Sequence, residues 1–146
     1  MPYRSDLTPH PIVLMIAHGR LERHDWSRMF DDLEALLARG QTFAVLLDAR
    51  EAGLPDFGDM RDCASFLRER EPLLARWHRG IACVTPSPMI RGLLKGVVQL
   101  SAMPMPVAMF EDGASAHAWL CERLGLDPSK RDIVLDDRID AVGPSR

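Results

Sequence analysis

The chain has 146 residues, of which 47% are hydrophobic and 27% are charged, and its formal net charge is -3. This length is typical of one domain, and the apolar fraction is too high for a disordered chain. The mild negative charge gives no electrostatic reason to bind nucleic acid, which favours basic surfaces. We therefore expect a single globular domain without a nucleic-acid partner.

The sequence also lacks the patterns of export and of membrane insertion. The amino terminus, MPYRSDLTPH, does not have the basic-then-apolar order of a signal peptide. The most apolar long region, residues 89–110, contains Arg91, Lys95 and two prolines, so it does not suit a membrane-spanning helix. The odd number of cysteines without close pairing favours buried thiols in a reducing compartment. We expect a cytoplasmic location, with the thiols at Cys63, Cys83 and Cys121.

Four short apolar runs predict the buried strands of one sheet. They are Ile12–His18, Phe43–Asp48, Ile81–Val84 and Val107–Phe110. Tyr3–Asp6 is a candidate for a brief extra strand that pairs with the first run.

The segments between these runs have the spacing of amphipathic helices. In residues 25–40 we expect Asp25 to cap the helix and Gly40 to end it. The next helix is interrupted at Pro72, which begins a further helical turn through Trp77. The apolar stripes are Trp26, Met29, Phe30, Leu33 and Leu37 in the first helix, and Met60, Cys63, Ala64 and Leu67 in the second.

Two more helices are expected in the second half of the chain. Ser87 is the predicted cap of the first, and Pro88 occupies its first turn. Helical geometry then leaves Arg91 and Lys95 in solvent. The stripe expected to face the sheet is Ile90, Leu93, Leu94, Val97 and Val98. The last helix covers about residues 114–124, with Ala116, Leu120 and Leu124 inward and Gly125 as its end.

This alternation of strands and helices predicts the α/β fold class. We expect a single small domain with a four- to five-stranded, largely parallel or mixed sheet covered by about four helices. The domain is expected over residues 1–126, and residues 127–146 form a C-terminal extension with few apolar side chains.

Asp48 ends the second apolar run, where α/β domains often place ligands and phosphoacceptors. The strand resembles the phosphoacceptor strand of a response-regulator receiver. A receiver also needs an acid pair after its first strand and a lysine after its last, but these strands end IAHGR and AMFEDG. Magnesium would therefore lack oxygen ligands. We interpret Asp48 and the following loop as capping and connecting elements.

A second set of spaced patterns covers most of residues 12–124. A strand ending in Gly-Arg-Leu is followed by F-x-x-L-E-x-L, then by FAVLLDAR, and finally by F-E-D-x-x-x-A-x-A-W-L. Together these resemble the SpoIIAA-like branch of the STAS family, which is related by description to CRAL-TRIO-type lipid-binding proteins. The resemblance implies a small sheet covered by helices and a regulatory module without catalytic residues.

Anti-anti-sigma regulators of this family carry a phosphorylatable serine just before the helix that follows this strand. A helix start suits phosphate because its free N–H groups and dipole favour an anion. Here the segment reads LPDFGDM, with Asp56 and Asp59 and no Ser or Thr before Ser65. Two carboxylates repel phosphate and are themselves suited to a helix start. We therefore expect no serine phospho-switch.

Other candidate sites have ordinary structural explanations. His18 and His24 with Asp25 lack the paired spacing of a zinc site, and Ser87 lies outside any G-x-S-x-G elbow. We therefore expect no metal, no cofactor and no hydrolase triad. Gly92 and Gly96, four residues apart, suggest a helix face that lies close to the sheet or to another helix. The three tryptophans are expected in the core or at its rim.

A methionine-rich segment is the remaining candidate for a binding surface. Methionine fills irregular cores, and it is also common on adaptable binding surfaces. Because Pro104 and Pro106 stop the preceding helix, we expect at least one of Met103 and Met105 to be exposed on a loop. The candidate surface for a partner or ligand consists of Met89, Arg91, Lys95, Met103 and Met105, with Met109 nearby.

The sequence therefore favours a non-enzymatic, protein-binding or regulatory module that forms a homodimer. The alternative is a carrier or sensor of a small apolar or acyl ligand, including a lipid. A third reading, an enzyme using carboxylates at the strand ends, needs clustered acids in a cleft. A pocket lined by Met and Leu side chains favours the carrier, whereas a solid core under a flat Met-rich face favours the partner module.

Overall fold

A computed structural model describes residues 2–8, 10–101 and 103–127. Within them the strands are β1 (Tyr3–Asp6), β2 (Ile12–Gly19), β3 (Phe43–Ala52), β4 (His78–Val84) and β5 (Val107–Phe110). The helices are α1 (Arg23–Ala38), α2 (Phe57–Glu69), α3 (Glu71–Trp77), α4 (Pro88–Ser101) and α5 (Gly113–Leu124). The predicted extension lies outside the described residues from residue 128 onward.

The five strands form one mixed sheet in chain order, β1-β2-β3-β4-β5. β1 pairs antiparallel with β2, and the other neighbours are parallel. The predicted α/β class and all the predicted strands are confirmed. The additional helix is α3, which was expected only as a further helical turn.

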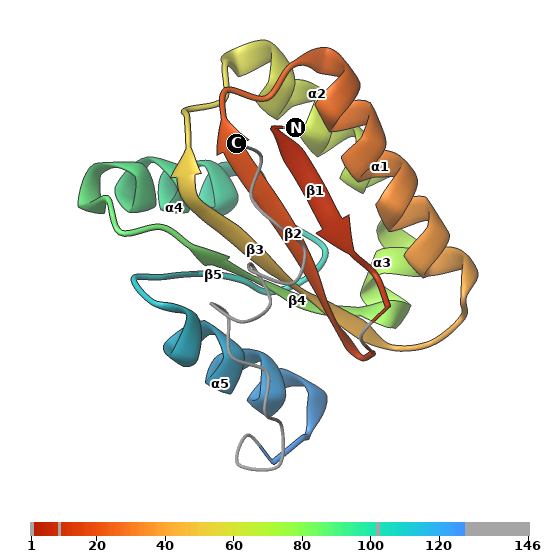
Figure 1. The fold of residues 1–146 in the computed structure, drawn as a ribbon. Coiled ribbons are helices and arrows are strands. Elements are labelled where there is room, and N and C mark those ends of the chain that lie inside the picture. The colour runs from red at the N-terminus through yellow and green to blue at the C-terminus, as the bar shows by residue number, and fades with distance from the viewer. Residues whose placement is uncertain (1, 9, 102, 128–146) are drawn as a thin grey trace.

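The order of the strands explains how the helices are arranged around the sheet. Right-handed crossovers that advance in one direction place every connecting helix on the same face. Side chains of α1, α2 and α3 accordingly share one core with the sheet, and α5 packs on the opposite face. Figure 1 shows α5 on the other side of the sheet from α1, with α4 lying apart from α1, α2 and α3. None of the described helices combines the length and apolar character needed to cross a bilayer.

Alternation along each strand divides the buried side chains between the two faces. Val13, Met15 and Val45 point toward the core shared with α1, α2 and α3. Leu14, Leu46 and their neighbours point toward α5. The sheet is therefore covered on both faces, as expected for largely parallel strands.

Capping groups fix most of the helix starts where the sequence places them. Asp56 Oδ1 accepts a hydrogen bond from Asp59 N at 2.8 Å, and Asp112 Oδ1 accepts one from Ser115 N at 2.7 Å. Ser87 Oγ accepts one from Ile90 N at 3.3 Å, which confirms the predicted start of α4.

The predicted start of α1 is wrong by three residues. Glu22 is the N-cap, and Asp25 lies inside the first turn, fully buried. Asp25 Oδ2 accepts a hydrogen bond from Glu22 N at 2.9 Å, so the carboxylate holds the helix start from within the helix. The predicted ends are correct, since Gly40 and Gly125 have φ of 62° and 70°, a conformation that glycine tolerates.

Candidate functional site: an apolar cavity between the sheet and three helices

A cavity of about 220 Å³ lies between one face of the sheet and helices α1, α2 and α4. Its floor consists of the side chains that four strands direct to this face. They are Met15 and Ala17 of β2, Val45, Leu47 and Ala49 of β3, Ile81 and Cys83 of β4, and Val107 and Met109 of β5. Ala17, Ala49 and Cys83 are small, which leaves space above the middle of the sheet.

Three helices form the walls of this cavity. Most residues of the helical stripes that the sequence predicts as core-facing line it. They are Trp26, Met29, Phe30 and Leu33 of α1, Met60, Cys63, Ala64 and Leu67 of α2, and Ile90, Leu94 and Val98 of α4. Most residues of these stripes therefore face the sheet as expected, but they do not fill the space completely.

Methionine is prominent in this lining. The chain has eight methionines, and five of those in the described residues line the cavity: Met15, Met29, Met60, Met103 and Met109. Their unbranched, polarisable side chains can adjust to differently shaped contents. The lining is thus suited to apolar molecules of more than one shape.

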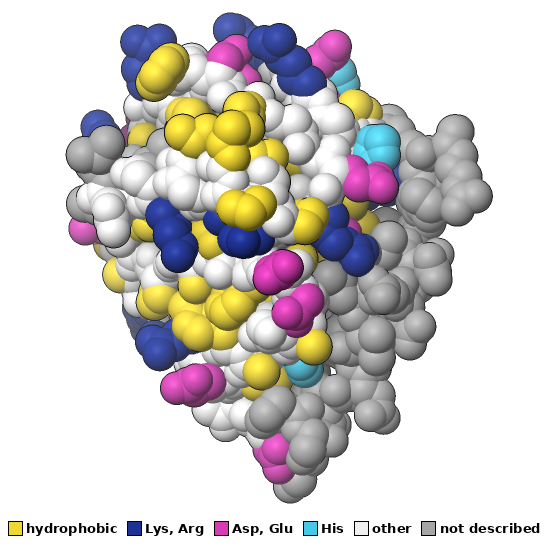
Figure 2. All heavy atoms as spheres, turned by 90° about the vertical axis from the view of Figure 1, so that its left-hand side faces the viewer, with side chains coloured by type: hydrophobic (Ala, Val, Ile, Leu, Met, Phe, Trp, Pro, Cys, Tyr) yellow, Lys and Arg dark blue, Asp and Glu magenta, His cyan; other side chains and the backbone are white. Residues whose placement is uncertain are grey.

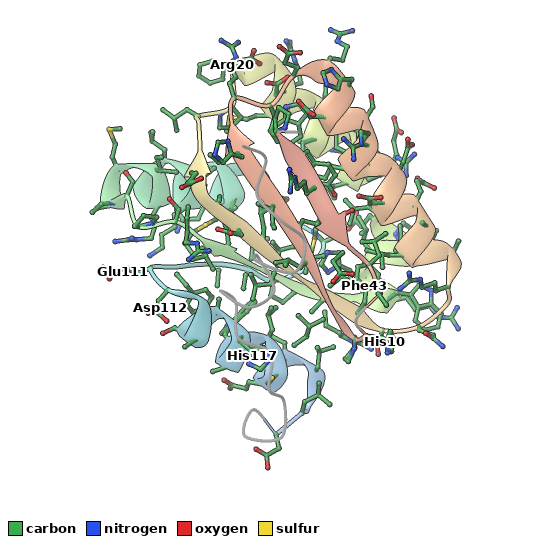
Figure 3. The ribbon with its side chains drawn as sticks, in the orientation of Figure 1. His10, Arg20, Phe43, Glu111, Asp112 and His117 are labelled. Carbon is green, nitrogen blue, oxygen red and sulfur yellow. The ribbon has the colours of Figure 1, made fainter. Side chains whose placement is uncertain are left out.

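The cavity reaches the carboxyl end of the sheet, where Leu21, Gly53 and Pro55 contribute to its lining. Leu21 also lines a neighbouring polar hollow, with Arg20, Glu22, Arg23, Asp56 and Asp59. Arg20 lies at this end of the molecule and Phe43 at the opposite end (Figure 3). Ligands of open α/β sheets commonly bind at the carboxyl ends of the strands.

Exposed charged side chains line the polar hollow. Arg20 Nη2 lies 3.3 Å from Asp56 Oδ2, and both side chains are largely exposed, so solvent screens the pair. The backbone N–H of Asp59 lowers the pKa of Asp56, which keeps this carboxylate ionised as a cap.

The titratable side chains within the cavity lining are two thiols. Burial raises the pKa of Cys63 to about 11 and that of Cys83 to about 12. Both thiols are therefore neutral at physiological pH and are poor nucleophiles. The other described lining side chains carry no acid or base, so the lining offers apolar contact rather than acid–base chemistry.

One polar atom in the cavity wall has no partner. Trp26 lines the cavity, and its indole Nε1 is buried without a hydrogen-bond partner among the described residues. The Trp26 ring contacts Phe30 in a tilted arrangement, with ring centroids 6.3 Å apart. Buried indole N–H groups usually find an acceptor, so this donor requires an explanation.

A protein-family profile matches the part of the chain that forms most of the sheet and its helices. The SpoIIAA-like family profile matches residues 12–121, from the start of β2 into α5. The chain belongs to the SpoIIAA-like family. No relative is found among curated proteins.

Solved structures with the SpoIIAA-like fold agree with this assignment. An uncharacterised protein from Shewanella loihica PV-4 with this fold is 19% identical, with a TM-score of 0.62, over 82% of this chain and 92% of that one. The anti-sigma factor antagonist SpoIIAA in its unphosphorylated form is 14% identical, with a TM-score of 0.53, over 77% and 91%. An anti-sigma factor antagonist from Mycobacterium paratuberculosis is 9% identical, with a TM-score of 0.52, over 81% and 92%. At these identities the likeness establishes the shared fold.

The methionine-rich segment of this SpoIIAA-like chain is arranged differently from the predicted surface. Met105 is 3% exposed and belongs to the core, and Met103 is half-buried and lines the cavity. The expectation of an exposed methionine in this loop is therefore wrong, because the loop folds inward after α4. Met89 and Lys95 are exposed, as a binding surface requires, and their role stays a prediction.

Three expectations for α4 are also corrected. Leu93 is 52% exposed and does not face the sheet, whereas the side chain of Val97 lies outside the described part of the chain. Arg91 is not fully solvated, since its Nη1 donates to Thr85 O at 2.8 Å. Gly92 and Gly96 make no close approach, since a Cβ at either would meet nothing within 4 Å.

Asp48 lies within β3 rather than at its end, because the strand continues to Ala52. The carboxylate is 4% exposed, and its Oδ1 accepts hydrogen bonds from Arg50 N at 3.1 Å and Arg50 Nε at 3.0 Å. The neighbouring Leu47 and Ala49 face the cavity, so alternation directs Asp48 to the opposite face. Asp48 is therefore neither a loop connector nor a part of the cavity.

The histidines are distributed between surface and core. His18 Nε2 lies 2.8 Å from Glu51 Oε2, and His24 Nε2 lies 3.4 Å from Asp25 Oδ1. Within the described residues no three His, Cys, Asp or Glu side chains are grouped as metal ligands. His78 and His117 are buried, which the sequence pattern does not indicate.

Proposed function

We propose that this SpoIIAA-like protein is a non-enzymatic regulatory module that binds a small apolar ligand in the cavity. The observation that carries the proposal is the cavity of about 220 Å³ with its almost entirely apolar lining. Ligand sites of this kind are concave, largely apolar and supplied with few polar groups. The sequence left two readings open, a protein-binding module and a carrier or sensor of a small ligand. A cavity lined by methionine and leucine favours the carrier or sensor.

The size of the cavity restricts its contents. An apolar protein cavity of about 150 Å³ stays free of water and binds benzene. The larger space here suits a substituted aromatic ring or a short branched acyl group. A long, straight lipid chain would extend beyond a cavity of this size.

The chemistry of the lining supports binding rather than catalysis. Burial keeps Cys63 and Cys83 neutral. Of the three carboxylates of the neighbouring polar hollow, Glu22 and Asp56 are exposed, and Asp59 lies in the first turn of α2, where its N–H donates to Asp56. The third reading, an enzyme, would need acids with perturbed pKa values inside a cleft. The same two aspartates occupy the helix start, which supports the expectation that a serine phospho-switch is lacking there.

A direct test measures the melting temperature with α-methylstyrene as a probe. Binding to the folded state adds about 2.7 kcal/mol of stability at a probe concentration about 100 times Kd, so the wild-type protein should melt at a higher temperature. Ala49→Leu fills the floor of the cavity and should abolish this increase, while the free variant stays at least as stable as wild type.

Leu93→Ala provides the matched control, because Leu93 is exposed on the outside of the α4 wall. This variant should keep the full probe-induced increase. No increase for the wild type, or an equal increase for Ala49→Leu, would overturn the proposed function.

A second candidate function is protein binding through the outer face of α4. Met89 is 66% exposed and Leu93 is 52% exposed, next to the exposed Gly92 and Lys95. Figure 2 shows the side of the molecule on which α4 lies, with hydrophobic side chains gathered in patches that lysine and arginine side chains separate. Such apolar surface suits a protein partner or a second copy of the chain, and homodimer formation here stays a prediction.

A further inference from the structure

We infer that Trp26 Nε1 is the polar anchor of the cavity and that the ligand is a neutral molecule with an apolar body and one hydrogen-bond acceptor, such as a carbonyl oxygen. This inference rests on the proposed function and specifies its ligand class. It arises from the combination of an apolar cavity with one wall residue whose buried N–H has no partner in the part of the chain that the structure describes.

The donor at Trp26 favours an acceptor that comes from a ligand. Water inside a protein usually makes two to four hydrogen bonds, and the side chains of the described lining supply few groups that could form them. A carbonyl oxygen needs only one donor, while the apolar part of the same ligand can contact Met29, Phe30 and the other apolar side chains of the lining. The ligand acceptor would then satisfy the indole N–H that folding leaves unpaired.

The charges around the cavity favour a neutral acceptor over a carboxylate. The described lining residues include no lysine or arginine, and burying an ionised group without an opposite charge is strongly unfavourable. In the neighbouring polar hollow, Arg20 is already paired with Asp56.

The test uses three probes of similar shape on the full chain. Acetophenone carries a carbonyl oxygen, α-methylstyrene replaces that oxygen with a CH₂ group, and benzoate carries a negative charge. Dissociation constants are measured by calorimetry for wild type, Trp26→Phe and Trp119→Phe. Trp119 packs on the opposite face with α5, so Trp119→Phe is the matched control for losing an indole.

The decisive quantity is the preference for the ketone over the alkene, because a change in packing affects both neutral probes. Trp26→Phe should reduce this preference by about threefold to tenfold, the range expected for one hydrogen bond. Trp119→Phe should leave it unchanged. Benzoate should not bind at concentrations at which acetophenone saturates the wild-type protein.

Nuclear magnetic resonance provides a second readout that a purely structural role would not change. The indole N–H signal that is missing in Trp26→Phe should move downfield when acetophenone is added to wild type, and should not do so with α-methylstyrene.

Each contrary result has a distinct meaning. An unchanged preference in Trp26→Phe would overturn the anchor while leaving the cavity as a ligand site. Benzoate binding as tight as that of acetophenone would overturn the neutral ligand class. If neither neutral probe binds the wild-type protein, the proposed function fails and the anchor fails with it.

Discussion

At the residue scale, we expect His78 to make the folded protein sensitive to acid. The imidazole is 2% exposed at the start of β4, where its Nδ1 accepts a hydrogen bond from Gly80 N at 3.2 Å and its ring contacts Phe43. Burial lowers the pKa of His78 from 6.5 to about 3. The folded state therefore holds this histidine neutral over a range in which the unfolded chain protonates it.

The sign of the pH effect follows from this lowered pKa. The stabilising contribution of His78 is fully present above about pH 6.5 and is lost as the pH falls toward 3, by up to about 1.4 kcal/mol per pH unit. His78→Asn keeps an acceptor for Gly80 N but does not titrate. Urea unfolding from pH 7 to 4 should show a steeper loss for wild type than for this variant. Parallel losses would contradict the account.

At the element scale, α4 is the helix whose two sides differ most. Ile90, Leu94 and Val98 line the cavity, whereas Met89 and Leu93 are exposed. The two glycines on the helix contribute no packing, and glycine within a helix costs about 0.5–1 kcal/mol relative to alanine. The glycines therefore reduce the stability of the helix that forms one cavity wall.

Gly92→Ala should stabilise the protein by up to about 1 kcal/mol, because the added Cβ meets no atom within 4 Å. Gly80→Ala is the matched comparison with the opposite expected sign. Gly80 has φ of 155°, and its added Cβ would lie 3.1 Å from the Trp119 ring. Thermal unfolding of both variants measures the two effects. A loss of stability in Gly92→Ala would mean that this position does need close packing.

The sequence predicted the elements more accurately than the space between them. Apolar runs and caps such as Ser87 and Gly125 determine local backbone structure, so the strands and helix ends could be read from nearby residues. A stripe such as Ile90 and Leu94 shows which side of a helix is buried, but not whether that side meets a solid core or a cavity. That outcome depends on small residues of distant strands, such as Ala49 of β3 and Cys83 of β4.

The corrected residues illustrate the same limit. At least one of Met103 and Met105, on either side of Pro104, was expected to be exposed, but the return of the chain from α4 to β5 carries Met105 into the core and Met103 into the cavity lining. The unpartnered nitrogen of Trp26 could not be identified either, since an amphipathic stripe gives no information about hydrogen-bond partners. Tertiary contacts, rather than local pattern, decide both positions.

At the scale of the whole molecule, the two faces of the sheet are packed differently. On one face α5 lies directly over small, fully buried residues such as Ala44 and Ala82. On the other face, α1, α2 and α4 lie around the cavity, and α4 is separated from the other helices. The central claim is that the second face holds a ligand within the fold, whereas the outer face of α4 remains a separate surface.

The most direct test of this claim is a titration of protein labelled with ¹³C at the methionine methyl groups, with α-methylstyrene as the ligand and NMR as the readout. The methyl signals of the lining residues should shift together and saturate: Met15, Met29, Met60, Met103 and Met109. Met89, exposed on the outside of α4, should not shift. Saturating shifts confined to the lining methionines would agree with the account, whereas unchanged spectra or a response confined to Met89 would contradict it.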